Sequence, residues 1–303
     1  MKTDHRNKAR IKKQWSFCFL LMLFLGSCSL NQSFLYPDYH FSHKIDKLKA
    51  ADPSYDVNVL LDSNYAPTFV NNKKESLTLD YVVESIWQTS ESNNLLHGWA
   101  MTPKKNYNGI TLLLLHGNSG NVIDNHYTII PLIKRGFKVC LFDYSGFGLS
   151  QGKATRKNVK KDGLAALDYV LEHKDSLTKK VFIYGQSLGG HLTPVIAIQR
   201  EKEIDGIIIE GAFSSHKDIS QEFSGIMGRI FVAEYYNGKK AIKKFHKPVL
   251  IIHSTEDETV PYKMGETLYS QANNPKKFLE IAYCHLCGIF NYPDKIASMI
   301  MAM

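Results

Sequence analysis

Residues 181–191 read Val181-Phe-Ile-Tyr-Gly185-Gln-Ser187-Leu-Gly189-Gly190-His191. The four apolar residues at the start are typical of a buried strand, and the residues that follow Ser187 are compatible with a helix. Gly-x-Ser-x-Gly often arises by chance, but between a strand and a helix it predicts a sharp turn that exposes a reactive serine. Such a turn strains the serine backbone, and the glycines leave room for the neighbouring strand and helix. The stretch therefore predicts Ser187 as a nucleophile.

Outward from this stretch, strand and helix patterns alternate along the chain. An antiparallel strand is predicted from Leu77 to Val83, with a partner at Leu95–Met101. Continuous apolar runs, typical of parallel strands covered on both faces, follow at Ile110–Leu115, Phe137–Phe142, Val181–Tyr184, Ile207–Ile209 and Val249–Ile252. Helical spacing lies between them at Asp124–Arg135, Lys157–His173, Leu188–Arg200 and Tyr262–Ala272. This rhythm predicts an α/β fold with an open, doubly wound sheet.

The predicted domain organisation has three parts. Residues 1–27 form a signal peptide, residues 28–75 a polar tether and N-terminal extension, and residues 76–303 the α/β domain. Residues 214–245 interrupt the alternation with scattered apolar and aromatic side chains. They predict a small helical cap, with an ordinary crossover and long loop as the alternative.

The leader has the features of an export signal. A basic start precedes an apolar run, Trp15–Leu25, that is short for a membrane span. The run ends in Leu25-Gly26-Ser27-Cys28, which resembles a bacterial lipobox and predicts lipidation of Cys28. The expected location is the cell envelope, as a membrane-anchored lipoprotein that faces the periplasm or the exterior. The alternatives are an ordinary cleaved signal peptide, which gives a secreted protein, and an uncleaved anchor.

Charge and cysteine content argue against a nucleic-acid-binding protein, a disulfide-rich protein and a zinc protein. The formal net charge is +8, but residues 1–27 hold six basic residues and one acidic residue, which leaves 31 basic against 28 acidic. The remaining chain has no nucleic-acid footprint. Outside the leader and Cys28, the cysteines are Cys140, Cys284 and Cys287, which form neither a disulfide framework nor a zinc pattern. We expect free thiols or one incidental bridge.

The partners of Ser187 follow from the architecture. Ligands bind at the carboxyl ends of the strands in open α/β sheets, and the order along the chain is serine, acid, histidine. Asp257 follows the Val249–Ile252 run and is the predicted acid, with Glu256 and Glu258 as competitors. His285 is then the one histidine after the acid, and it is the predicted base. Structural roles are expected for His116, His191 and His253.

An oxyanion that forms during attack by Ser187 needs preorganised hydrogen-bond donors. The amide of Leu188, directly after the serine, is the first expected donor. The amide of Asn118, in the loop after the Ile110–Leu115 run, is the second. The N-terminus of the helix after Ser187 adds partial positive charge.

Together these segments resemble the α/β-hydrolase superfamily, in its serine-aminopeptidase-like or abhydrolase branch. The resemblance covers residues 76–303 and depends on four motifs: His116-Gly-Asn-Ser-Gly, Asp143-Tyr-Ser-Gly-Phe-Gly-Leu-Ser, Gly185-Gln-Ser-Leu-Gly-Gly and Asp257-Glu-Thr-Val-Pro. It implies a mostly parallel sheet of about eight strands and hydrolysis through an acyl-serine intermediate, with neither metal nor cofactor. Relatives commonly have glycine where this chain has Ser254 and Cys284, which leaves the exact position of His285 open.

The expected function is that of a membrane-tethered serine hydrolase acting on a small-molecule ester or thioester, with lipid or acyl chains as attractive substrates. The alternatives are a serine peptidase or aminopeptidase and a non-catalytic scaffold. The oligomeric state is left unassigned. Because Cys284 and Cys287 flank His285, a further hypothesis is that their oxidation displaces the imidazole and stops catalysis.

Overall fold

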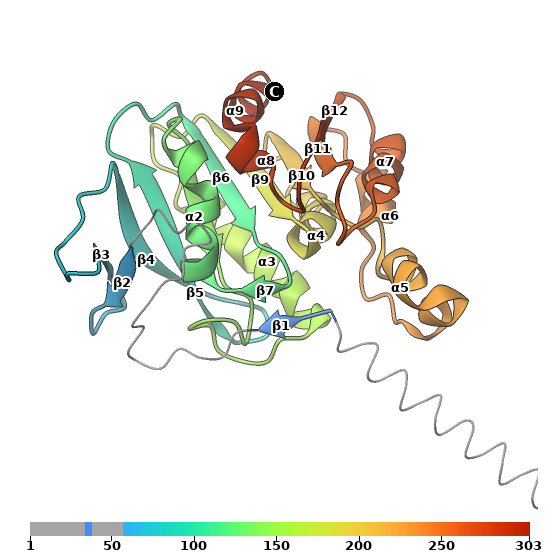
Figure 1. The fold of residues 1–303 in the computed structure, drawn as a ribbon, viewed down its shortest axis with the longest axis horizontal. Helices are drawn as coiled ribbons and strands as arrows, with labels where there is room; N and C mark the ends of the chain where they lie inside the picture. Colours follow the sequence, from blue (N-terminus) through green and yellow to red (C-terminus); the bar gives the residue numbers. More distant parts are fainter. Residues whose placement is uncertain (1–33, 38–56) are drawn as a thin grey trace, which may run out of the picture. The chain divides into compact units, whose positions relative to one another are not determined.

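The computed structural model describes residues 34–37 and 57–303 (Figure 1). The predicted signal peptide, Cys28 and most of the predicted tether lie outside these ranges. Within them, none of the helices combines the length and hydrophobicity that crossing a bilayer requires. The described residues divide into two compact units, which are considered separately: residue 34 with 216–234, and residues 35–37, 57–215 and 235–303.

The larger unit is built on a sheet with eight strands in the described ranges, in the order β12-β11-β10-β9-β6-β8-β5-β4. Antiparallel pairing joins β4 (Tyr81–Thr89) to β5 (Leu95–Pro103), and β5 to β8. The other strands run parallel to one another: β6 (Ile110–Leu115), β8 (Lys138–Phe142), β9 (Lys180–Gln186), β10 (Gly206–Glu210), β11 (Val249–Ser254) and β12 (Lys276–Ile281). The predicted mostly parallel sheet is confirmed.

Helices cover both faces of this sheet (Figure 1), which explains why β6, β10 and β11 are buried along their whole length. One face carries α2 (Val122–Ile133), α8 (Gly288–Asn291) and α9 (Pro293–Met301). The opposite face carries α3 (Arg156–Glu172), α4 (Leu188–Ala197), α6 (Gly238–Ile242) and α7 (Tyr262–Gln271). The sequence did not predict α8 and α9, whose Ile289, Ile296 and Ile300 are fully buried.

Part of the predicted N-terminal extension belongs to the folded core. Strands β2 (Asn58–Leu61) and β3 (Pro67–Val70) form an antiparallel hairpin, and its Val59 and Phe69 join the main hydrophobic cluster. Strand β1 (Tyr36–Pro37) pairs with β7 (Ser119–Gly120) in the loop after β6. These strands have two to four residues, too few to show a clear alternation of apolar and polar side chains.

The predicted cap segment, residues 214–245, contains two helices that fall into different units. Helix α6 belongs to the larger unit, and α5 (His216–Phe231) belongs to the smaller one. A kink at Ser224 and Gly225, with φ of +58° at the glycine, divides α5 into two parts. The side chains of Arg229 and Asp218 form an ion pair across this kink, with 2.6 Å between nitrogen and oxygen.

Candidate active site

Ser187 occupies the turn between β9 and α4 that the sequence predicts. Its φ and ψ are +51° and −112°, a strained conformation for a residue with a side chain. The serine N–H donates to the carbonyl of Glu210 at 2.9 Å, which fixes the turn against the end of β10. A Cβ on Gly189 would overlap the carbonyl oxygen of Leu115, so glycine is required there for α4 to approach the sheet.

Asp257 follows β11 and has a side chain that is only 1% exposed. Its Oδ1 accepts hydrogen bonds from the backbone amides of Thr259 at 2.9 Å and Val260 at 2.7 Å. Its Oδ2 lies 2.6 Å from Nδ1 of His285. Burial raises the pKa of Asp257, but the bond and charge of the imidazole and the loop amides outweigh it, so this pKa lies below its usual value.

The competing acids do not take this position. Glu256 Oε2 accepts a hydrogen bond from the amide of Tyr283 at 3.2 Å, and Glu258 is exposed. Within the described residues, Asp257 is the acid in hydrogen-bond contact with His285. The role of this pair in catalysis stays a prediction.

His285 follows β12 and is partly exposed. A Cβ on Gly211, directly after β10, would lie 3.0 Å from His285 Cε1. Since Ser187 donates to the carbonyl of the preceding residue, Glu210, the predicted nucleophile and base approach the same point at the end of β10. The fold therefore gathers the three predicted residues from the ends of three strands at one edge of the sheet.

Both departures from the usual motif have partners in the structure. The hydroxyl of Ser254 donates to the carbonyl of Tyr283, which ties the end of β11 to the histidine loop. Cys284 and Cys287 are joined by a disulfide, the incidental bridge that the sequence analysis allowed. The contact between His285 and Asp257 is present with the disulfide formed, so the structure does not show the predicted displacement of the imidazole.

The predicted oxyanion donors lie on the two segments that flank Ser187. Leu188 is the first residue of α4, and Asn118 lies in the loop after β6, where its carbonyl accepts from the amide of Tyr36 at 2.8 Å. A Cβ on Gly117 would lie 3.7 Å from Ser187 Cβ. This loop therefore runs beside the serine, and donation to an oxyanion stays a prediction.

Two of the remaining histidines are packed against aromatic rings. His116 is fully buried against the rings of Tyr144 and Phe147, and burial lowers its pKa to about 4. His191 stacks on Phe213, with Nδ1 at 3.1 Å from the carbonyl of that residue. These contacts agree with the structural roles expected for both residues.

His253 has a contact that the sequence analysis missed. Its Nε2 lies 2.9 Å from the carbonyl of Val260 and 3.5 Å from Oδ2 of Asp257. Burial lowers the pKa of this imidazole, although both oxygens act in the opposite direction. A second, uncharged imidazole therefore packs beside the predicted acid. The spacing of four residues between His253 and Asp257 was visible in the sequence, but the turn that brings them together was not.

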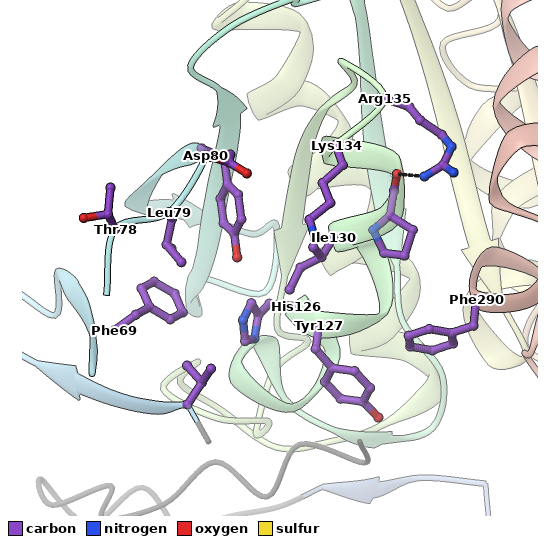
Figure 2. Close-up of a pocket in the computed structure, with 13 residues that line it drawn as sticks. Phe69, Thr78, Leu79, Asp80, His126, Tyr127, Ile130, Lys134, Arg135 and Phe290 are labelled. Atoms are coloured by element: carbon purple, nitrogen blue, oxygen red, sulfur yellow. Dashed lines mark hydrogen bonds between the residues drawn. The ribbon is translucent and has the colours of Figure 1, made fainter. Parts of the chain in front are cut away.

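A separate cavity of about 400 Å³ lies beside α2 and also escaped the sequence analysis. Figure 2 shows Phe69 and Leu79 on one side, and His126 and Ile130 projecting from α2. Most of the lining is apolar, and Ser187, Asp257 and His285 are not part of it. The cavity and the predicted catalytic residues are therefore distinct features of the larger unit.

Comparisons with known proteins show which chains this one is similar to. The family model described as serine aminopeptidase, S33, matches residues 108–243. The uncharacterised protein YfhR of Escherichia coli (strain K12) is 30% identical over 203 residues, which cover 65% of this chain and 71% of YfhR. The α/β hydrolase domain-containing protein WAV2 of Arabidopsis thaliana is 27% identical over 215 residues, or 65% of this chain and 70% of WAV2.

Among solved structures, the esterase Pf2001 of Pyrococcus furiosus superposes with a TM-score of 0.61 at 19% identity, over 73% of this chain and 90% of that one. At this identity the likeness concerns the fold alone. One conclusion follows from the strand order, the strained serine between β9 and α4, the family model and the similarity to YfhR: this chain belongs to the α/β-hydrolase superfamily.

Proposed function

We propose that this protein is a serine hydrolase that cleaves carboxylic esters or thioesters through an acyl-serine intermediate. The observation that carries the proposal is the 2.6 Å contact between His285 Nδ1 and Asp257 Oδ2, at the same end of the sheet as a serine in a strained strand-to-helix turn. A carboxylate can only accept at this contact, so the proton sits on Nδ1. Nε2 is then left with a lone pair that can accept the proton of Ser187.

The proposed reaction has two halves. Ser187 Oγ attacks the acyl carbon while its proton passes to His285 Nε2, and the imidazolium then protonates the departing alcohol or thiol. Water next attacks the acyl-serine, gives a proton to His285, and releases the acid as Ser187 recovers its proton. In both halves the amides of Leu188 and Asn118 stabilise the negative oxygen.

The bond that is cleaved has two candidates. Similarity in fold to the esterase Pf2001 supports an ester, whereas the family model carries the name of an aminopeptidase. We place the ester first on the strength of this fold similarity and keep the peptide bond as the alternative. A non-catalytic scaffold would have no need for the strain at Ser187.

We also propose that Cys28 carries a lipid anchor that holds the protein at the cell envelope, on the basis of Leu25-Gly26-Ser27-Cys28. Growth of the producing cells with an alkyne-tagged palmitate tests it. Wild type should incorporate the tag and Cys28→Ala should not. Equal incorporation by both proteins would refute the anchor.

A fluorophosphonate probe tests the enzymatic proposal, because it reacts with activated serines. We expect labelling of wild type and none of Ser187→Ala; an unlabelled wild type would refute the proposal.

A panel of p-nitrophenyl esters set against aminoacyl-anilides then decides between the bonds. Faster turnover of the anilides would replace the esterase by the peptidase.

A further inference from the structure

Glu210 is a buried carboxylate that the proposed mechanism does not use. It is the last residue of β10 and is 1% exposed. Its Oε2 accepts hydrogen bonds from the hydroxyl of Tyr184 at 2.8 Å and from Gln186 Nε2 at 3.0 Å. Its Oε1 accepts from the backbone amide of Gly288 at 2.8 Å. Three donors therefore hold one carboxylate, which is how buried charge is tolerated.

These bonds connect two parts of the proposed site. On one side, Tyr184 and Gln186 belong to β9, which leads into Ser187, and the serine amide itself donates to the backbone carbonyl of Glu210. On the other side, Gly288 is three residues after His285. One residue thus contacts the nucleophile turn through its backbone and the histidine loop through its side chain.

The disulfide extends the restraint at Gly288 to the loop that carries His285. Cys284 and Cys287 are bonded to each other, so His285 lies inside a small closed ring of backbone. The amide that contacts Glu210 belongs to Gly288, the next residue after this ring. A tether at Gly288 therefore restrains the whole ring. The opposite end of the loop is held by Ser254, whose hydroxyl donates to the carbonyl of Tyr283.

We propose that Glu210 is a positioning residue that fixes the histidine loop relative to Ser187, and thereby sets the separation of nucleophile and base. The inference rests on the proposed function, since it concerns the same site. Glu210 is buried beneath the loop, so it acts through His285 and does not touch substrate. Its removal should affect the chemical step more than substrate binding.

The test compares Glu210→Ala with Asp205→Ala. Asp205 precedes β10 and accepts a hydrogen bond from the amide of Val181 at 2.8 Å, so it joins the same two strands at the end remote from Ser187. Steady-state kinetics with a p-nitrophenyl ester and thermal unfolding are measured for both variants. We expect Glu210→Ala to lose about 10- to 100-fold in kcat with little change in KM, as small displacements of catalytic groups do. Asp205→Ala should lose stability and keep kcat.

Two conservative variants separate positioning from folding. Glu210→Gln keeps an acceptor oxygen for Gly288 and should recover most of the lost kcat. Glu210→Asp keeps the charge but is one methylene too short, so it should stay slow, and it decides the test if the alanine variant does not fold. Wild-type kcat in Glu210→Ala, or in Glu210→Asp where the alanine variant does not fold, would overturn the inference while the proposed function stands. A wild type that fluorophosphonate does not label would overturn both.

Discussion

Oδ2 of Asp257 lies 2.6 Å from Nδ1 of His285 and accepts a hydrogen bond from this nitrogen. The carboxylate thereby selects the tautomer in which Nε2 is free to act as a base. Asp257→Asn replaces this acceptor by a group that can also donate, which favours the wrong tautomer. We expect kcat for an ester to fall by about 10⁴-fold. The neighbouring exposed acid provides the control: Glu258→Gln should retain wild-type kcat, and a comparable loss there would contradict the assignment of Asp257.

The strained backbone at Ser187 predicts that two inactive variants differ in stability. Both Ser187→Ala and Ser187→Gly should abolish ester turnover and fluorophosphonate labelling. Glycine tolerates φ of +51° and alanine does not, so the glycine variant should be more stable than the alanine variant by about 1 kcal/mol. Thermal or urea unfolding measures the difference. Equal stability would mean that the turn is not strained.

The disulfide predicts how catalysis responds to reductant. Because His285 contacts Asp257 while Cys284 and Cys287 are bonded, the oxidised protein should be active. Reduction frees the histidine loop, so we expect kcat to stay equal or to fall, and Cys287→Ser should match the reduced wild type. Cys140→Ser is the control, because burial raises the pKa of the Cys140 thiol to about 12 and keeps it unreactive. A several-fold rise of kcat on reduction would instead restore the hypothesis that oxidation displaces the imidazole.

We expect the stability of the protein to depend on pH through His126, which lines the cavity beside α2. Burial lowers its pKa from 6.5 to about 4. Between these values the unfolded chain binds a proton that the folded chain does not. The free energy of unfolding should therefore fall as the pH drops from 6.5 to about 4, by up to about 1.4 kcal/mol per pH unit for this residue. Urea unfolding across this range should show a shallower pH slope for His126→Gln. Wild-type protein unfolded in the same buffers provides the reference slope.

Much of the fold and the positions of the candidate residues followed from local sequence. The apolar run at Ile110–Leu115 coincides with β6, because a strand covered on both faces leaves an unmistakable pattern. The position of Asp257 after a predicted strand indicated the acid, and chain order then left His285 as its histidine; the catalytic roles of both stay predictions. Contacts made by side chains across the fold were not predictable in this way. The bond from Gly288 to Glu210 joins residues 78 positions apart, and neither position has a local pattern that indicates its partner.

The hairpin of β2 and β3 is a case in which local sequence led to a wrong prediction. Its four-residue strands contribute Val59 and Phe69 to the core, but their neighbours are polar enough to predict a tether. Tertiary contacts with the rest of the cluster, rather than intrinsic preference, decide the structure of such short segments.

The place of β12 at the outer end of the sheet has a consequence for biosynthesis. Strand β12 pairs with β11 and leads directly into His285, so the imidazole reaches Asp257 only after the ribosome has released the segment that follows residue 276. A nascent chain that already presents Ser187 would lack its predicted base until this segment has emerged. Catalytic competence would then depend on the docking of β12 against β11.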